Sequence, residues 1–169
     1  MATSETAPQA AAQTAYVTLA LGDEVFAVSV AFVREILDYQ APFAIPDGPN
    51  YLLGLTDVRG RGTPTLDLRL KLGLPRATPT TATRVLVLDV PLADRVLSLG
   101  LVADRVIEVI SVAADQIETA PDIGVPWRSD YIQGVVRRDT AAGKGGFVVI
   151  FDLPRLLTSQ DVAVIAQAA

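Results

Sequence analysis

An internal repeat constrains the fold of this chain more than any other feature of its sequence. Each copy contains a valine followed two residues later by a glutamate, then a proline, a Tyr-x-x-Gly pattern and an Asp-Leu pair with a leucine behind it. The first copy has these residues at Val33, Glu35, Pro46, Tyr51, Gly54, Asp67, Leu68 and Leu72, and the second at Val106, Glu108, Pro121, Tyr131, Gly134, Asp152, Leu153 and Leu157. Two similar units predict two similar small barrels in one chain. They also favour a protein that presents surfaces over one with a single catalytic cleft.

Length and hydrophobicity define the broad class of protein. With 169 residues, half of them hydrophobic, the chain is long enough for one ordinary domain or two small intertwined ones. Its apolar runs are too short to cross a bilayer, so no transmembrane helix is predicted. Residues 1–14 lack the basic start and apolar stretch of a signal peptide and are predicted to form a flexible tail. The chain is therefore expected in the cytoplasm, without direct insertion into a membrane.

The missing residue types exclude several kinds of chemistry. A net charge of -5 and a pI near 4.6 disfavour binding to nucleic acid. The chain has no cysteine, and therefore no disulfide, thiolate zinc site or cysteine nucleophile. It has no histidine, which removes the commonest general base, the commonest metal ligand and any phospho-accepting histidine. We therefore predict that the chain is not an enzyme and needs no metal or cofactor.

Short strands separated by turns dominate the sequence pattern. The expected strands are residues 16–20, 25–30, 84–90, 96–102 and 147–151. Turns are expected at Gly22-Asp23 and at Gly60-Arg61-Gly62. Short helices are expected directly after Asp67 and after Asp152, and the segment from Ser29 to Leu37 fits either a helix or a strand. The predicted fold class is all-β with short helices.

The repeat and its flanking segments predict the domain organisation. One domain covers residues 15–158, with a first repeat over about 15–75 and a second over about 84–158. A linker rich in threonine, alanine and proline separates them at about 76–83. A terminal helix is expected over 159–169.

Apparent chemical motifs are weak. Gly143-Lys144-Gly145-Gly146 lacks the spacing of a phosphate-binding loop, and a hairpin tip is the favoured interpretation. Trp127 could be a recognition residue, but a lone tryptophan more often packs against a core. Five aspartates could be grouped into a metal site, but aspartate is ordinary at turns and strand ends, so solvated or capping roles are favoured. They are Asp57, Asp67, Asp89, Asp94 and Asp104.

Glu35 and Arg59 stand apart because each lies within or at the end of an apolar run. Opposite charges placed after equivalent strands can meet on one face of a barrel. An exposed pair contributes only about 0–1 kcal/mol to stability. Its larger use is to orient a partner and to reject wrong ones. We therefore expect Glu35 and Arg59 to lie close together on an exposed partner-binding face.

At these residues the chain resembles the CheW family of bacterial chemotaxis coupling proteins. The resemblance covers roughly residues 15–165 and depends on the joint order of many short patterns. These are Phe26-Ala27-Val28, Val33-Arg34-Glu35-Ile36, Ile45-Pro46, Gly54, Val58-Arg59-Gly60, Pro64, Leu66-Asp67-Leu68-Arg69, Gly100-Leu101-Val102-Ala103-Asp104, Glu108-Val109, Tyr131-Ile132-Gln133-Gly134 and Ile150-Phe151-Asp152. Asp57 departs from the asparagine that is frequent in the family, and Arg61 stands where an apolar residue is usual.

The resemblance implies two SH3-like five-stranded β-barrels that share a core and perform no catalysis. It also implies an adaptor that joins the cytoplasmic tips of chemoreceptors (methyl-accepting chemotaxis proteins) to the regulatory domain of the histidine kinase CheA. Such chains are recruited to membrane-associated receptor arrays, where they alternate with the kinase in rings that can include other CheW-like chains. The residues implied in partner binding are Val33, Glu35, Gly54, Arg59, Gly60 and Pro64 on the first barrel, and Val87 and Gly100 on the kinase-facing side of the second.

Two other functions stay open at the level of sequence. One is a CheW-fold scaffold in another signalling pathway, and the other is a small enzyme that uses carboxylates. The individual residues also have alternatives, since Gly54 and Gly60 can serve turn geometry and Val33 and Val87 can serve core packing. We expect a structural role for Gly60 and a partner contact for Gly54.

Overall fold

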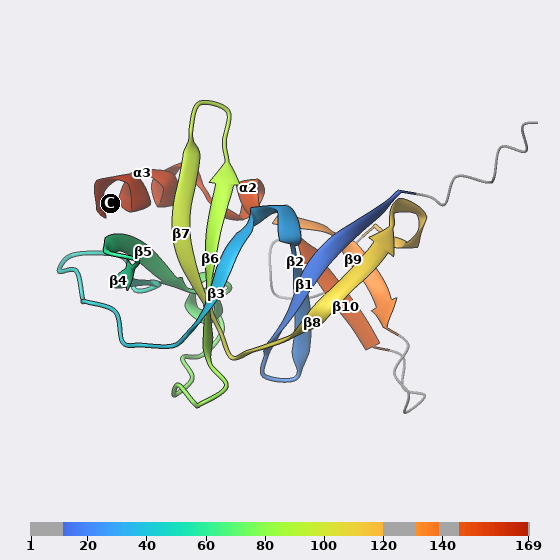
Figure 1. Cartoon of the computed structure of the whole chain (residues 1–169), viewed down its shortest axis with the longest axis horizontal. Coiled ribbons are helices and arrows are strands. Elements are labelled where there is room, and N and C mark those ends of the chain that lie inside the picture. Colours follow the sequence, from blue (N-terminus) through green and yellow to red (C-terminus); the bar gives the residue numbers. More distant parts are fainter. Residues whose placement is uncertain (1–11, 120–130, 139–145, 169) are drawn as a thin grey trace, which may run out of the picture.

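Two five-stranded sheets form most of the protein. The computed structural model describes residues 12–119, 131–138 and 146–168. Sheet A has the strand order β8-β1-β2-β10-β9 and sheet B has the order β3-β6-β7-β5-β4. Figure 1 shows the two sheets side by side, sheet A in the right half and sheet B in the left half. The prediction of an all-β fold with two five-stranded units is confirmed.

The strands of sheet A are β1 (Gln13–Leu21), β2 (Glu24–Ser29), β8 (Arg105–Ala113), β9 (Ile132–Arg138) and β10 (Gly146–Phe151). The strands of sheet B are β3 (Val33–Asp38), β4 (Leu52–Val58), β5 (Arg61–Asp67), β6 (Arg84–Pro91) and β7 (Val96–Ala103). The helices are α1 (Leu68–Lys71), α2 (Leu153–Leu156) and α3 (Ser159–Ala168), with 3-10 turns η1 (Val30–Phe32) and η2 (Ala114–Gln116). The segment that fitted either helix or strand is thus a 3-10 turn followed by β3.

The two sheets do not correspond to the two sequence repeats. The hairpin β1–β2 belongs to the first repeat, yet it completes the sheet of β8, β9 and β10 from the second. In the same way the hairpin β6–β7 of the second repeat completes the sheet of β3, β4 and β5. The repeats have therefore exchanged hairpins, so the expectation of one barrel for each copy is wrong. Sequence repeats show which segments are alike, but not which copies of them pair.

One hydrophobic core joins the sheets. Leu19, Phe26 and Val28 of sheet A belong to the same buried cluster as Leu86 and Leu99 of sheet B. The Phe26 ring stacks on that of Phe151, with ring centroids 5.0 Å apart. A smaller cluster that includes Tyr16, Val112 and Ile150 fills the other face of sheet A. Because β1 is buried on both faces, it has the continuous apolar sequence from which a strand was predicted.

Equivalent caps and turns recur in both repeats. Asp67 accepts hydrogen bonds from the backbone N–H groups that open α1, and Asp152 does the same for α2. Both predicted short helices are therefore confirmed, and so is the turn at Gly22-Asp23 between β1 and β2. Helix α3 confirms the predicted terminal helix and lies beside β5 and β7 of sheet B (Figure 1).

Several expectations fall on residues outside the described ranges. They concern the glycine-rich turn at 143–145, Pro121 and Trp127. The linker expected at 76–83 is described and contains no helix or strand. Among the helices of the described ranges, none has the length and apolar character needed to span a bilayer.

Candidate partner-binding site

All eight residues implied by the family resemblance belong to sheet B, either in its strands or in the turn between β4 and β5. Four of them share one row of strand partners that crosses the sheet. Glu35 on β3 pairs with Val87 on β6, which pairs with Gly100 on β7, then Thr65 on β5 and Gly54 on β4. Assigning Val87 and Gly100 to a second barrel was therefore wrong, because the exchanged hairpin carries β6 and β7 into the sheet of the first repeat.

Four of the eight residues are buried: Gly54, Pro64, Val87 and Gly100. Val87 has no exposed surface, so core packing describes its side chain. A Cβ on Gly100 would come 2.8 Å from the Thr65 hydroxyl and 3.0 Å from a Val85 methyl group. Both positions support the sheet behind the exposed face in this structure.

Gly54 closes the edge of sheet B. Its φ is +139°, and a Cβ there would come 1.8 Å from the carbonyl oxygen of Phe43. That carbonyl accepts a hydrogen bond from the N–H of Leu55, and the N–H of Phe43 donates to the Leu55 carbonyl. The missing side chain of Gly54 lets the segment before Ile45 pair with β4, so Gly54 has a structural role here. The partner contact expected at Gly54 stays a prediction.

A two-residue turn connects β4 to β5 and carries the exposed part of the site. Arg59 and Gly60 both have positive φ, +53° and +84°, as a type I′ hairpin turn requires. The Asp57 carboxylate accepts a 2.8 Å hydrogen bond from the N–H of Gly60 and fixes the turn. Arg61 and Gly62 are paired residues of β5, so the predicted turn lies one residue too late.

The turn brings Arg59 to Glu35 from β3. The Arg59 Nη2 and Nε atoms donate to Glu35 Oε2 at 3.1 and 3.2 Å. The hydrogen bonds to Glu35 raise the pKa of the Arg59 guanidinium above its ordinary value. The Arg59 side chain is 83% exposed and that of Glu35 is 17% exposed. The predicted proximity of these two charges on an exposed face is confirmed.

A hollow of about 370 Å³ lies beside this ion pair. Its lining residues are Arg34, Glu35, Val58, Arg59 and Arg61. Arg34 is also held by Asp89 on the neighbouring strand β6, with 3.2 Å between Arg34 Nε and Asp89 Oδ2. The site therefore presents three guanidinium groups and one half-buried carboxylate. The part played by Arg34 was missed from the sequence, because the register of β3 against β6 decides it.

The five aspartates considered as metal ligands each have a separate structural partner. Asp57 holds the β4–β5 turn, Asp67 caps α1, and Asp89 pairs with Arg34. Asp94 pairs with Arg95, and Asp104 with Arg69 and the N–H of Gly22. Within residues 12–119, 131–138 and 146–168, no three acidic side chains are grouped as a metal site.

Helix α3 contributes a buried polar cluster that sequence reasoning missed. The Asp161 side chain, 2% exposed, accepts hydrogen bonds from Tyr51 Oη, Lys71 Nζ and the N–H of Thr158. Burial alone would raise the pKa of Asp161, but these hydrogen bonds outweigh it and lower the pKa below its ordinary value. Asp161 is 110 residues from Tyr51 and 90 from Lys71, so no local pattern indicates the cluster.

Comparison with known proteins places this geometry in a family. The family model described as "CheW-like domain" matches residues 15–161. The chemotaxis protein CheW of Klebsiella aerogenes is 30% identical over 154 residues, which cover 91% of this chain and 87% of that protein. The CheW of Treponema pallidum is 28% identical over 89% of this chain and 85% of its own length. That of Bacillus subtilis is 34% identical over 68% of this chain and 70% of its own length.

A solved structure shares the fold. The scaffolding protein TtCheW from Thermoanaerobacter tengcongensis superposes with a TM-score of 0.74 and 21% sequence identity. The match covers 89% of this chain and 91% of that protein. At this identity the likeness shows that the two paired five-stranded sheets are a common architecture.

Proposed function

The chain belongs to the CheW family, and from that premise we propose that it joins the cytoplasmic tips of chemoreceptors to the regulatory domain of the histidine kinase CheA. Family members are scaffolds rather than enzymes, so the chain is a non-catalytic chemotaxis adaptor. We further propose that it works in the cytoplasm at membrane-associated arrays, in rings that alternate it with the kinase.

The Glu35–Arg59 pair carries this proposal. Arg59 is presented to solvent by a tight turn, while Glu35 is held within the sheet and fixes the direction of the guanidinium. Charges arranged in this way contribute little to folding, because water screens them. At an interface they select the partner, and removing one of them leaves the charge on the partner buried and unpaired.

The proposal is tested by separating the charge from the turn. Arg59→Asn keeps a residue that type I′ turns favour but removes the cation, so it should fold as the wild type does. Arg59→Glu and Glu35→Arg reverse each charge in turn. Each variant is titrated against a receptor tip fragment and the CheA regulatory domain. We expect all three to lose at least about tenfold in affinity for one of these partners.

Glu108→Arg is the matched control. Glu108 is the equivalent glutamate of the second repeat, is exposed, and has no ion pair among the described residues. Wild-type binding of both partners by the three Glu35 and Arg59 variants, with normal circular dichroism spectra, would remove the pair from the site. If the wild type itself binds neither partner, the alternative function of a scaffold in another signalling pathway is favoured. A pull-down from native lysate would then identify its partners.

A further inference from the structure

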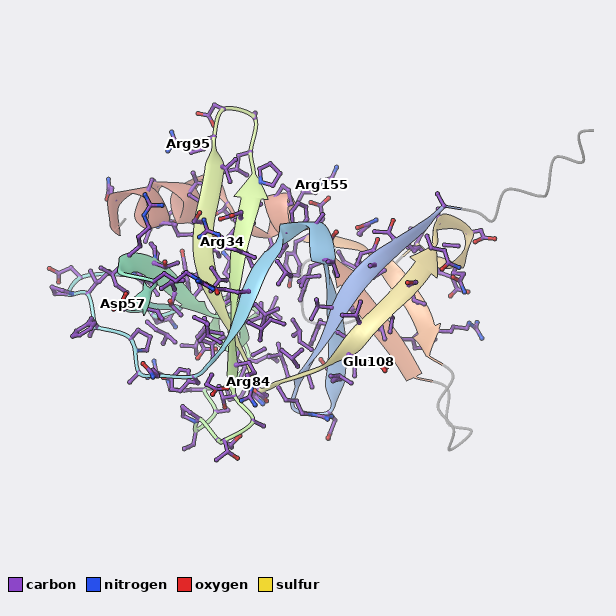
Figure 2. All side chains as sticks on the ribbon, viewed as in Figure 1. Arg34, Asp57, Arg84, Arg95, Glu108 and Arg155 are labelled. Carbon is purple, nitrogen blue, oxygen red and sulfur yellow. The ribbon has the colours of Figure 1, made fainter. Side chains whose placement is uncertain are left out.

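A second surface depression lies next to the Glu35–Arg59 hollow and shares Arg34 and Arg61 with it. It is a groove of about 520 Å³, bounded by strands β3, β5 and β7 and by helix α3. Residues that line it include Arg34, Arg61, Arg95, Val96, Leu97 and Ile165. Figure 2 places Arg34 and Arg95 in the half of the molecule that contains sheet B, and Glu108 in the other half.

The groove is basic although the protein is acidic. Three arginines line it and no aspartate or glutamate does, whereas the whole chain has a net charge of -5. Arg34 and Arg95 each have one acidic neighbour, Asp89 and Asp94, and their own side chains are 45% and 49% exposed. Within the described residues Arg61 has no ion pair and no side-chain hydrogen bond. At least one guanidinium therefore faces the groove with its donors uncommitted.

The groove also offers an apolar surface. Val96 is 63% exposed at the edge of the groove, while Leu97 and Ile165 are buried beneath it. Ile165 is held there because Asp161, one turn earlier on α3, is bound by Tyr51 and Lys71. The wall that α3 provides is thus fixed before any partner arrives, which reduces the entropy lost on binding.

We propose that this groove binds an acidic segment of a partner protein, with carboxylates on the arginines and an apolar side chain against Val96. The planar guanidinium fork matches the two oxygens of a carboxylate, and such charge-assisted pairs direct recognition. The exposed valine favours a protein segment over a polyphosphate or an anionic lipid surface, because those ligands have no apolar group to place beside it. The groove adjoins the Glu35–Arg59 hollow and shares two arginines with it, but neither Glu35 nor Arg59 lines it, and the inference does not depend on the proposed chemotaxis function.

The test uses the full chain and needs neither receptor nor kinase. An array of short peptides, each with a central leucine and glutamates at varied spacing, is probed alongside counterparts with glutamine in place of glutamate. The best binder is labelled with fluorescein and titrated by anisotropy. We expect binding to the glutamate peptides only, weakening as salt is raised. Arg61→Glu should reduce the affinity about tenfold or more, and Arg61→Lys much less.

Arg105→Glu is the matched control, because Arg105 opens strand β8 of sheet A as Arg61 opens β5 of sheet B. It is exposed, has no ion pair among the described residues, and its replacement changes the net charge equally. Retained binding in Arg105→Glu supports the groove. Equal losses in both variants, equal binding of glutamine peptides, or no binding anywhere on the array would overturn the proposal. Tighter Arg61-dependent binding of polyphosphate or of phosphatidylglycerol vesicles would also overturn it, in favour of those ligands.

Discussion

Sheets A and B have the same architecture but different surfaces. In sheet B a row of paired residues runs from Glu35 on β3 to Gly54 on β4, and in sheet A the equivalent row runs from Glu108 on β8 to Gly134 on β9. The residues between the ends are Val87, Gly100 and Thr65 in sheet B, and Thr18, Ala27 and Ile150 in sheet A. Both rows thus begin at a glutamate and end at a glycine.

The two glutamates differ in what surrounds them. Glu35 is held by Arg59 from a tight turn, whereas Glu108 is exposed and has no ion pair among the described residues. The backbone N–H and carbonyl of Glu108 are instead bound by the Thr18 hydroxyl. The framework of paired residues is therefore the same in both sheets. The candidate site arises in sheet B from the β4–β5 turn, which supplies the arginine.

The two row-end glycines provide the largest expected effect on stability. Gly54→Ala should cost about 3–5 kcal/mol of unfolding free energy, because its Cβ would overlap the backbone carbonyl of Phe43. Gly134→Ala should cost less, about 2–3 kcal/mol. Its Cβ would come 2.7 Å from the backbone carbonyl oxygen of Glu118, which is a milder overlap than the 1.8 Å at Gly54, and 2.4 Å from a methyl group of Ile117 that can rotate. Urea unfolding of both variants measures the difference. An equal loss of unfolding free energy would show that the neighbouring backbone approaches the two glycines equally closely.

The next largest effect on stability is expected at helix α3, which lies beside β5 and β7 of sheet B. Asp161→Asn should cost about 3 kcal/mol, because it leaves the Lys71 ammonium, 13% exposed, without its anion. Lys71→Met is the companion variant, and Asp115→Asn on the exposed η2 turn of sheet A is the control. Loss of amide protection in α3 alone, measured by hydrogen exchange, should accompany the change. Unaltered protection of α3 would contradict the role given to Asp161.

The same carboxylate predicts a pH dependence. The folded-state pKa of Asp161 lies below its ordinary value, so its contribution to stability is complete above about pH 4. That contribution is lost as the pH falls through the lowered folded-state pKa. Asp104, whose pKa is lowered mainly by the hydrogen bond from Arg69, adds to the same loss. The free energy of unfolding, measured at a series of pH values from 7 to about 2, should therefore fall less for Asp161→Asn than for the wild type.

The β4–β5 turn gives a smaller effect. Gly60→Val should cost about 1–2 kcal/mol, because valine is strained at a φ of +84°. A Cβ at Gly60 would meet no atom within 4 Å, so the strain comes from the backbone alone. Gly146→Val is a control, since its Cβ would also be unobstructed and its φ is not positive. Equal melting temperatures for Gly60→Val and the wild type would show that the turn can change type freely.

The smallest effect on stability is expected at the two equivalent glutamates, Glu35 in sheet B and Glu108 in sheet A. Glu35→Gln and Glu108→Gln should both leave the melting temperature close to that of the wild type. An ion pair with a largely exposed arginine contributes little, and Glu108 is exposed and has no ion pair among the described residues. Only Glu35→Gln should weaken partner binding in the titrations described above. A stability loss confined to Glu35→Gln would mean that the pair serves folding, and would remove the contrast between the two sheets.

Local patterns in the sequence predicted most of the elements. Alternating and continuous apolar runs gave β1, β2, β6, β7 and β10, and an aspartate before a leucine gave each short helix. These signals depend on neighbouring residues, which a sequence displays directly. The placement of Glu35 and Arg59 within and at the end of apolar runs also singled them out, and their predicted proximity is confirmed by the ion pair.

Strand pairing could not be predicted in the same way. Val87 and Gly100 were assigned to the wrong sheet because the exchange of hairpins depends on contacts between distant segments. The bond between Asp161 and Lys71 and the groove beside Arg61 have the same origin. The structural role of Gly54 was also missed, because it depends on how closely Phe43 approaches β4. Each error concerns a three-dimensional distance rather than a residue type.

The hairpin exchange has a consequence for synthesis on the ribosome. Strands β3 to β7 are consecutive, so sheet B can form once the chain has been made as far as Ala103. The hairpin β1–β2 emerges earlier, but Thr18 cannot form its hydrogen bond until Glu108, 90 residues later, has been synthesised. At a typical translation rate this wait lasts roughly 5–20 s. The hairpin side chains that end up fully buried, Leu19 and Phe26 among them, lack their sheet A partners until then. Nascent chains should therefore need chaperone protection for their first two strands, while strands β3 to β7 can already pair before α3 and its Asp161 are made.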